Sequence, residues 1–120
     1  MITFDLPWPD PILNPNRSKG RHWAATAGAR DGARFSAYMA ACAAIPVGDN
    51  KNPVGPISLT ITFVQPDRRR RDRDNSLASL KPALDGVADA LGIDDSQFEP
   101  MTLKREYGKK PGSVRIEIGE

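Results

Sequence analysis

An amphipathic helical pattern in the middle of the chain, with an acidic pair at each end, limits the possible folds more than any other feature. Its apolar residues recur at helical spacing, with polar residues opposite: Leu77, Leu80, Leu84, Val87, Ala88 and Leu91. Because Pro82 is unfavourable inside a helix, we expect the helix to start near Ser79, after a turn or separate short piece at residues 75–78. Gly92 then fits the helix stop. Such a helix requires an apolar surface to cover.

Segments of alternating apolar and polar residues supply that surface. Residues 57–64 alternate Ile, Leu, Ile and Phe with Ser or Thr, and residues 2–8 alternate in a similar way. We predict two further strands at residues 98–107 and 113–118, joined as a hairpin by the glycine-flanked loop GKKPG. The sequence therefore predicts four strands.

A second helix is predicted from about residue 23 to residue 44. Alanines surround an apolar stripe at helical spacing: Phe35, Tyr38, Met39 and Cys42. Cys42 is expected to pack in the core rather than to act as a nucleophile. The elements then follow the order β-α-β-α-β-β. We expect one domain over residues 1–120, of α+β or α/β class, in which two helices pack on a mixed sheet.

The bulk composition excludes several classes of protein. The formal net charge of the 120 residues is only +2, so charge acts locally rather than as a global field. A single cysteine excludes an internal disulfide and fits a reducing compartment. No apolar run approaches the roughly 20 residues that span a bilayer, and the N-terminus lacks the pattern of a signal peptide. We therefore expect a cytoplasmic protein that does not contact membranes.

Positive charge is concentrated in two places. The first is the run Arg68, Arg69, Arg70 and Arg71, which Arg73 continues. The second is the proline- and asparagine-rich segment 9–22, which contains Arg17, Lys19 and Arg21. Because guanidinium groups bind phosphates in a fork geometry, both places predict contacts with a nucleic-acid backbone. The alternatives are a solvated basic patch for the run, and a solvated loop instead of a flap that orders on DNA.

Four aspartates flank the helical pattern, Asp72 and Asp74 before it and Asp94 and Asp95 after it. Residues two apart in an extended segment point the same way, and a helix packed back on the sheet can return the second pair to the same point. Two carboxylates near 4 Å repel by about 4 kcal/mol at an effective dielectric of 20, and a cation converts this repulsion into binding. Mg²⁺ prefers such oxygen ligands. The only histidine, His22, has no partner for a zinc site.

Lys81 lies between the two acidic pairs. Beside a metal that activates water, it is a candidate for stabilising the pentacovalent transition state or the leaving oxygen. Alternatively, Lys81 pairs with Asp85 at i,i+4. Aspartates in a D-x-D-N arrangement are also common turn and helix-cap residues, so a purely structural role for Asp72 and Asp74 stays open.

Together, these motifs resemble the RusA family of Holliday-junction resolvases, small endonucleases of bacteria and their prophages. The matching segments are LPWP at residues 6–9 with the basic loop after it, PDRRRRDRDN at 66–75, LKPALDGVADAL at 80–91 and DDSQ at 94–97. The resemblance covers most of the chain. It implies a homodimer with a mixed sheet and helices, which uses magnesium or manganese. It also implies that four-way DNA junctions are cut by paired symmetric nicks in recombination and repair.

The resemblance also assigns roles to single residues. The family's essential aspartates match Asp72, Asp74 and the 94–95 pair, where Asp95 is expected to be the metal ligand and Asp94 its neighbour. The family's lysine stands one helical turn after the second aspartate, where this chain has Ala78. Lys81 therefore matches it only if a short insertion is allowed.

Two other functions fit the same residues. One is a non-catalytic nucleic-acid-binding module, whose arginines clamp phosphates while the aspartates cap a turn. The other is a metal-dependent nuclease that acts on other branched or flapped DNA. Substitution of Asp74 separates the first of these from the junction resolvase, and a panel of DNA substrates separates the second.

Overall fold

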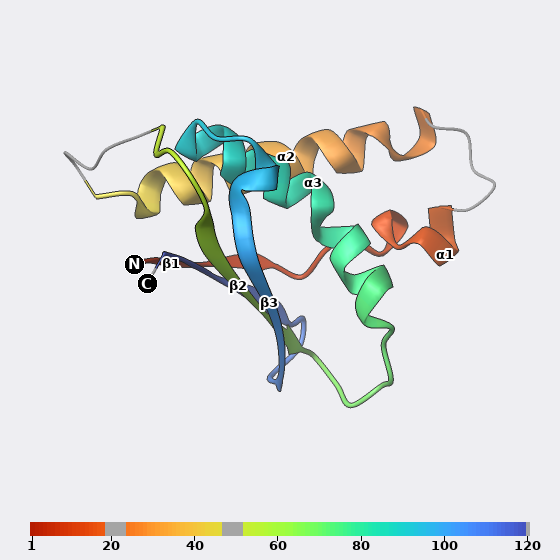
Figure 1. Cartoon of the computed structure of the whole chain (residues 1–120). Coiled ribbons are helices and arrows are strands. Elements are labelled where there is room, and N and C mark those ends of the chain that lie inside the picture. The colour runs from red at the N-terminus through yellow and green to blue at the C-terminus, as the bar shows by residue number, and fades with distance from the viewer. Residues whose placement is uncertain (19–23, 47–51, 120) are drawn as a thin grey trace.

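A mixed four-stranded sheet and two long helices dominate the computed structural model, which describes residues 1–18, 24–46 and 52–119 (Figure 1). The main elements are β1 (Ile2–Pro7), α2 (Ala24–Ala44), β2 (Ile57–Gln65), α3 (Arg73–Leu91), β3 (Phe98–Tyr107) and β4 (Ser113–Ile118). Three short helical turns were not predicted: η1 (Pro11–Leu13), α1 (Pro15–Ser18) and η2 (Asp95–Gln97). The α+β fold with a mixed sheet is thus confirmed. None of the helices within the described ranges is long and apolar enough to cross a membrane.

The strands follow the order β1-β4-β2-β3 in the sheet, so the predicted hairpin of β3 and β4 is wrong. β2 pairs with β3 in parallel and with β4 antiparallel, which places β2 between them. Burial explains this choice: Val114 and Ile116 of β4 are fully buried, whereas β3 exposes most of its residues. A strand with an apolar face buries more apolar surface in the centre of the sheet, whereas charged residues are favoured on an edge strand.

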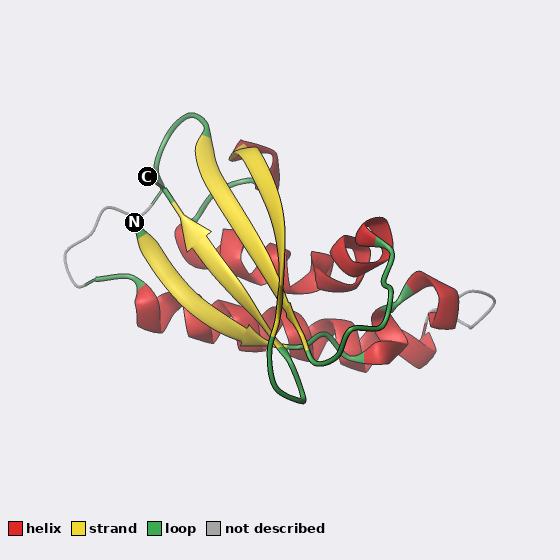
Figure 2. Cartoon of the chain, turned by 90° about the horizontal axis from the view of Figure 1, so that it is seen from below, coloured by secondary structure: helices red, strands yellow, loops and turns green. Residues whose placement is uncertain are grey.

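The two faces of the sheet differ in character. One face carries Leu59, Ile61 and Ile116, which are fully buried in a single core together with side chains of both long helices (Figure 2). Residues of the opposite face include Arg115, whose Nη1 donates to Oε2 of Glu106 at 3.1 Å. This alternation is the period-2 pattern that the sequence predicted.

Helix α3 begins six residues earlier than predicted, at Arg73 instead of Ser79. The side chain of Asp72 caps the helix. This N-cap is a start signal six residues before the one inferred from Pro82. Pro82 lies inside the helix, and α3 changes direction part-way along (Figure 1). Gly92, with φ of 71°, ends the helix in the left-handed conformation, as predicted.

Helix α2 packs on α3 through small residues. Ala37 and Ala41 are 1% exposed, whereas Phe35 and Met39 are 65% and 52% exposed. Phe35 and Met39 of the predicted apolar stripe therefore do not face the core, because the alanine face lets the two helix backbones approach more closely. Cys42 is partly buried against the core, near the edge of this contact.

Candidate active site at the start of helix α3

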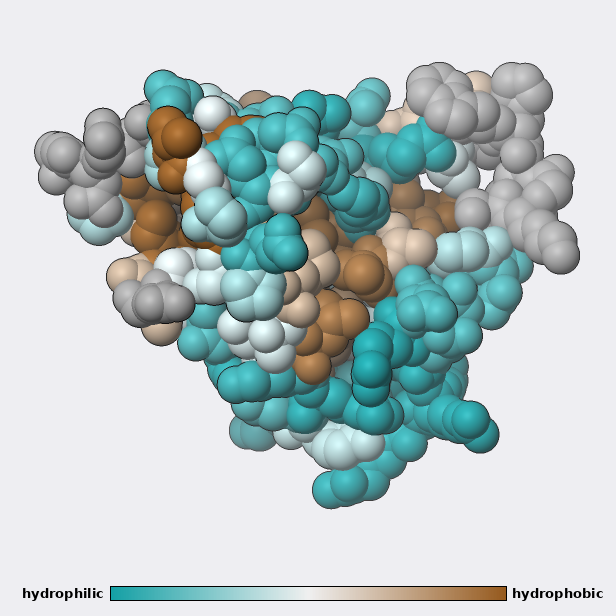
Figure 3. All heavy atoms as spheres, viewed as in Figure 1, coloured by the Kyte–Doolittle hydropathy of each residue, from teal (hydrophilic) through white to brown (hydrophobic). Residues whose placement is uncertain are grey.

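The topology of β2, α3 and β3 determines where the charged motif lies. Because β2 and β3 are parallel, their carboxyl ends meet at the same edge of the sheet. β2 ends at Gln65, residues 66–72 form a loop, and α3 starts at Arg73. In register, Gln65 faces Tyr107 at the end of β3. The arginine run, the start of α3 and the last residues of β3 therefore share one end of the molecule, which is covered by hydrophilic side chains (Figure 3).

Asp72 and Asp74 are both exposed at the start of α3. Oδ1 of Asp72 accepts a hydrogen bond of 2.9 Å from the backbone N–H of Asp74, so this carboxylate caps the helix. The second oxygen of Asp72 and the carboxylate of Asp74 have no hydrogen-bond or ion-pair partner among the described residues. The positive end of the helix dipole favours negative charge at this position. Asp74 lies in the first turn of α3 rather than in an extended segment, so the prediction that both carboxylates point to one place stays a prediction.

Two of the predicted phosphate-binding arginines are held by the protein itself. Nη1 of Arg71 donates to Oδ1 of Asp67 at 2.9 Å and to Oε1 of Gln65 at 3.4 Å. Its Cζ lies 5.3 Å from the ring centre of Trp8. Arg68 is placed over the ring of Tyr107, with 4.5 Å between its Cζ and the ring centre. Arg71 and Arg68 therefore brace the 66–72 loop.

The pKa of Asp67 offers a test of this brace. The hydrogen bond from Arg71, helped by the backbone N–H of Arg69, lowers the pKa of Asp67 from its ordinary 3.8 to about 2. The stabilisation is therefore present above pH 3.8 and is lost as the pH falls through about 2. We expect Arg71→Gln to move this pKa back toward its ordinary value, which carboxyl NMR titration measures. Arg70→Gln is the matched control, and an equal shift in that variant would contradict the brace.

Arg69, Arg70 and Arg73 are exposed and make no side-chain hydrogen bond or ion pair with another residue in the described part of the chain. Two polar clefts open beside them, and both are lined by Arg70, Arg71 and Asp72. The β3 cleft, of about 570 Å³, is completed mainly by Arg73, Ser76, Lys104 and Arg105. The N-terminal cleft, of about 320 Å³, is completed mainly by Trp8, Asn14, Asn16, Arg17, Arg69 and Asn75. Asp72 therefore lies where the two clefts meet.

Sequence reasoning missed Lys104, Arg105 and Trp8 as parts of this site. Lys104 and Arg105 lie on a strand predicted only for the sheet, and Trp8 was noted only as part of the LPWP segment. Trp8 does pack edge-on against Phe63, at 6.2 Å between ring centres, but it also walls the N-terminal cleft. A signal existed for β3, because its last residues alternate poorly and carry more charge than a buried strand tolerates.

The expectation that all four aspartates converge within one chain is wrong. Helix α3 has 19 residues, about 28 Å at 1.5 Å per residue. In a β-α-β unit the helix starts at the carboxyl end of one strand and finishes near the amino end of the next, so Asp94 and Asp95 follow its far end. In residues 1–18, 24–46 and 52–119, no group of three or more His, Cys, Asp or Glu side chains is arranged to hold a metal ion.

The second acidic pair is engaged in local contacts. Asp94 caps η2, and its hydrogen bond from the Ser96 hydroxyl lowers the pKa of this carboxyl. Asp95 forms an ion pair with Lys81. Nζ of Lys81 also lies 3.9 Å from Oδ1 of Asp85, which is the i,i+4 pair predicted as an alternative. The structure thus joins Asp95 to Lys81, near the middle of α3 rather than at its first turn.

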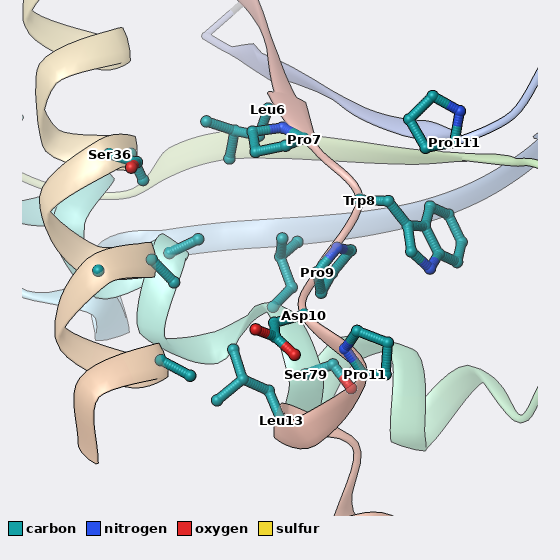
Figure 4. A pocket seen from close by; sticks show the side chains of 16 residues that line it. Leu6, Pro7, Trp8, Pro9, Asp10, Pro11, Leu13, Ser36, Ser79 and Pro111 are labelled. Atoms are coloured by element: carbon teal, nitrogen blue, oxygen red, sulfur yellow. The ribbon is translucent and has the colours of Figure 1, made fainter. Parts of the chain in front are cut away.

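The basic segment near the N-terminus is only partly described. Arg17 lines the N-terminal cleft from helix α1. Lys19, Arg21 and His22 lie outside the described residues, so the prediction of a basic flap stays a prediction. A more apolar pocket of about 700 Å³ lies between α2 and the residues after β1, and it shares Trp8, Pro9 and Ser79 with the N-terminal cleft (Figure 4). Asp10 at its edge accepts a hydrogen bond from the backbone of Ile12, so this pocket offers little polar chemistry.

The chain is similar in sequence to a bacterial protein. No family model matches the sequence. A protein of Xylella fastidiosa, described as uncharacterized, is 39% identical over 118 residues, which are 98% of this chain and 76% of the relative. The chain belongs to the same family as this protein. Because the relative's description names no activity, a function has to be inferred from the residues of the site.

The donors at the head of α3 fit one hard cation. Mg²⁺ is usually held by one or two carboxylates together with waters and substrate phosphate. Asp72 and Asp74 supply two carboxylates, and exposed arginines on either side supply positive charge for a phosphate. The arrangement suits a site where metal and substrate bind together. Asp72 and Asp74 are the side chains that would hold such a cation.

Proposed function

We propose that this protein is a metal-dependent, structure-selective DNA endonuclease that resolves four-way junctions. The observation that carries the proposal is the placement of Asp72, between two arginine-lined clefts and beside the exposed Asp74. The resemblance to RusA-type resolvases supplies the junction as substrate. We further infer that it acts in the cytoplasm of a bacterium, on host or prophage DNA.

Each residue of the site has a distinct part in the proposal. Asp72 and Asp74 would hold Mg²⁺ or Mn²⁺, which when bound supplies Lewis-acid stabilisation and a reactive water at neutral pH. Arg70 and Arg73 are placed to neutralise a phosphate that approaches the two carboxylates. Lys81 is paired with Asp95, so the proposal assigns it no part in the transition state.

The proposed enzyme works as a homodimer. A four-way junction is approximately two-fold symmetric, and a dimer with an isologous interface presents two equivalent sites to it. Each chain carries one pair formed by Asp72 and Asp74, so one protomer makes one nick. Paired nicks across the junction therefore require two copies.

A synthetic four-way junction provides the test. We expect paired, symmetric nicks in the junction with magnesium or manganese, none with a chelator, and much slower cutting of linear duplex of the same sequence. Gel analysis of each labelled strand maps the nicks. Equal cutting of duplex, flap and junction would reject junction selectivity and favour a nuclease for other branched DNA.

One observation favours a second function. Asp72 and Asp94 both act as helix caps, which is the structural role expected in a non-catalytic nucleic-acid-binding module. That function predicts tight junction binding without nicking in either metal. Binding without any cleavage would establish it in place of the nuclease.

A further inference from the structure

The β3 cleft has an unbalanced charge. The residues that line it include four arginines and one carboxylate: Arg70, Arg71, Arg73, Arg105 and Asp72. Lys104 also lines it, but the register places its side chain on the other face of the sheet, with Arg115. The single carboxylate caps α3 and so already accepts a hydrogen bond. Charge of one sign in a recess focuses the electrostatic field and raises the local concentration of the opposite charge. The cleft therefore favours an anionic ligand.

Arg105 has no competing partner in the part of the chain that the structure describes. It makes no side-chain hydrogen bond or ion pair with another residue of the described ranges. Its neighbour in sequence, Glu106, is turned to Arg115 instead, with 3.1 Å between Nη1 and Oε2. Arg105 lies opposite Phe63 in the parallel register, and Phe63 also lines the cleft. Glu106, the acid nearest in sequence, is thus turned away from the cleft, and the guanidinium of Arg105 is left to bind a ligand.

The position of the cleft identifies the anion. It shares Arg70, Arg71 and Asp72 with the N-terminal cleft, so one continuous polar surface passes over Asp72. A ligand that crosses this surface needs regularly spaced negative charges, as a nucleic-acid strand has. We propose that the β3 cleft binds a phosphate next to the cleaved one, on the same strand, with Arg105 as the phosphate-binding residue. The inference rests on the proposed function, because that function places the cleaved phosphate at Asp72.

Binding of a labelled four-way junction in calcium, without cleavage, tests this inference. We expect Arg105→Gln to weaken binding roughly tenfold or more, as for loss of a charge-assisted hydrogen bond. The slope of log K against log salt should fall by about one, because one phosphate contact is lost. Arg34→Gln removes the same charge near the other end of α3, where Arg34 pairs with Asp89, and should change neither quantity appreciably. Thermal melts check that both variants fold.

The outcomes separate the inference from the proposed function. Loss confined to Arg105→Gln supports the subsite, even if the wild type shows no metal-dependent cleavage and the nuclease proposal falls. Equal weakening by Arg34→Gln would show a general effect of net charge and overturn the subsite. If Arg105→Gln binds the junction as tightly as the wild type and with the same salt slope, the subsite is overturned as well. Junction cleavage by the wild type would still support the proposed function in that case.

Discussion

Replacing Asp74 by asparagine is expected to abolish junction cleavage and to leave folding and DNA binding in place. Asp74 is exposed in the first turn of α3, and its backbone N–H, not its carboxylate, makes the contact to Asp72. Asparagine keeps the shape of the side chain and removes its charge. The cost to stability is limited to the helix-dipole interaction, about 0.3–1 kcal/mol.

The effect on cleavage should be much larger. Loss of a residue that only supports a metal ligand typically costs about 10–100-fold in affinity or activity. Asp74 is one of only two carboxylates at the proposed metal site, so we expect a decrease of more than about a hundredfold. Single-turnover cleavage of a four-way junction in magnesium measures it, with junction binding in calcium measured in parallel.

Asp31→Asn is the matched control. Asp31 is exposed on α2, so this substitution removes the same charge outside the proposed site. Asp72→Asn gives a second test, because asparagine is as good a helix cap as aspartate. It should lose cleavage yet melt like the wild type. Cleavage by Asp74→Asn at the wild-type rate would contradict the nuclease proposal and leave both aspartates with their structural role alone.

The sequence predicted those parts of the fold that depend on local periodicity. β3 and β4 were predicted with the bounds that the structure shows, because alternation along a strand is encoded in neighbouring residues. The partner of each strand is not encoded in this way. β4 pairs with β1 and β2 because its buried valine and isoleucines gain most in the centre of the sheet, which is a property of the whole core.

The site shows the same division. The spacing of Asp72 and Asp74 is evident in the sequence, but their places at the N-cap and in the first turn of α3 were not predicted. The position of Asp94 and Asp95 beyond the other end of the helix follows from the parallel pairing of β2 with β3. The arginine run looked uniform in sequence. Only the three-dimensional positions of Asp67, Trp8 and Tyr107 divide it into bracing and exposed arginines.

Gly86→Ala is expected to destabilise the protein more than any other single methyl group added to α3. A Cβ at residue 86 would lie 2.1 Å from the backbone oxygen of Arg34 and 3.0 Å from the backbone nitrogen of Tyr38. Both atoms belong to the backbone of α2, so no side-chain rotation relieves the contact and the helices have to move apart. Overpacking of a core typically costs 1–3 kcal/mol, and we expect about 3 kcal/mol or more here.

Urea unfolding at equilibrium measures this cost, as a lower midpoint with an unchanged slope. Gly28→Ala on α2 is the control, because a Cβ there meets nothing within 4 Å. In a helix interior that change should stabilise the protein by up to about 1 kcal/mol. The two substitutions should change the free energy of unfolding in opposite directions. Alanine favours a helix equally at both positions, so the difference reports the close contact between α2 and α3 at Gly86. Equal midpoints for the two variants would mean that α2 and α3 do not approach as closely as Gly86 requires.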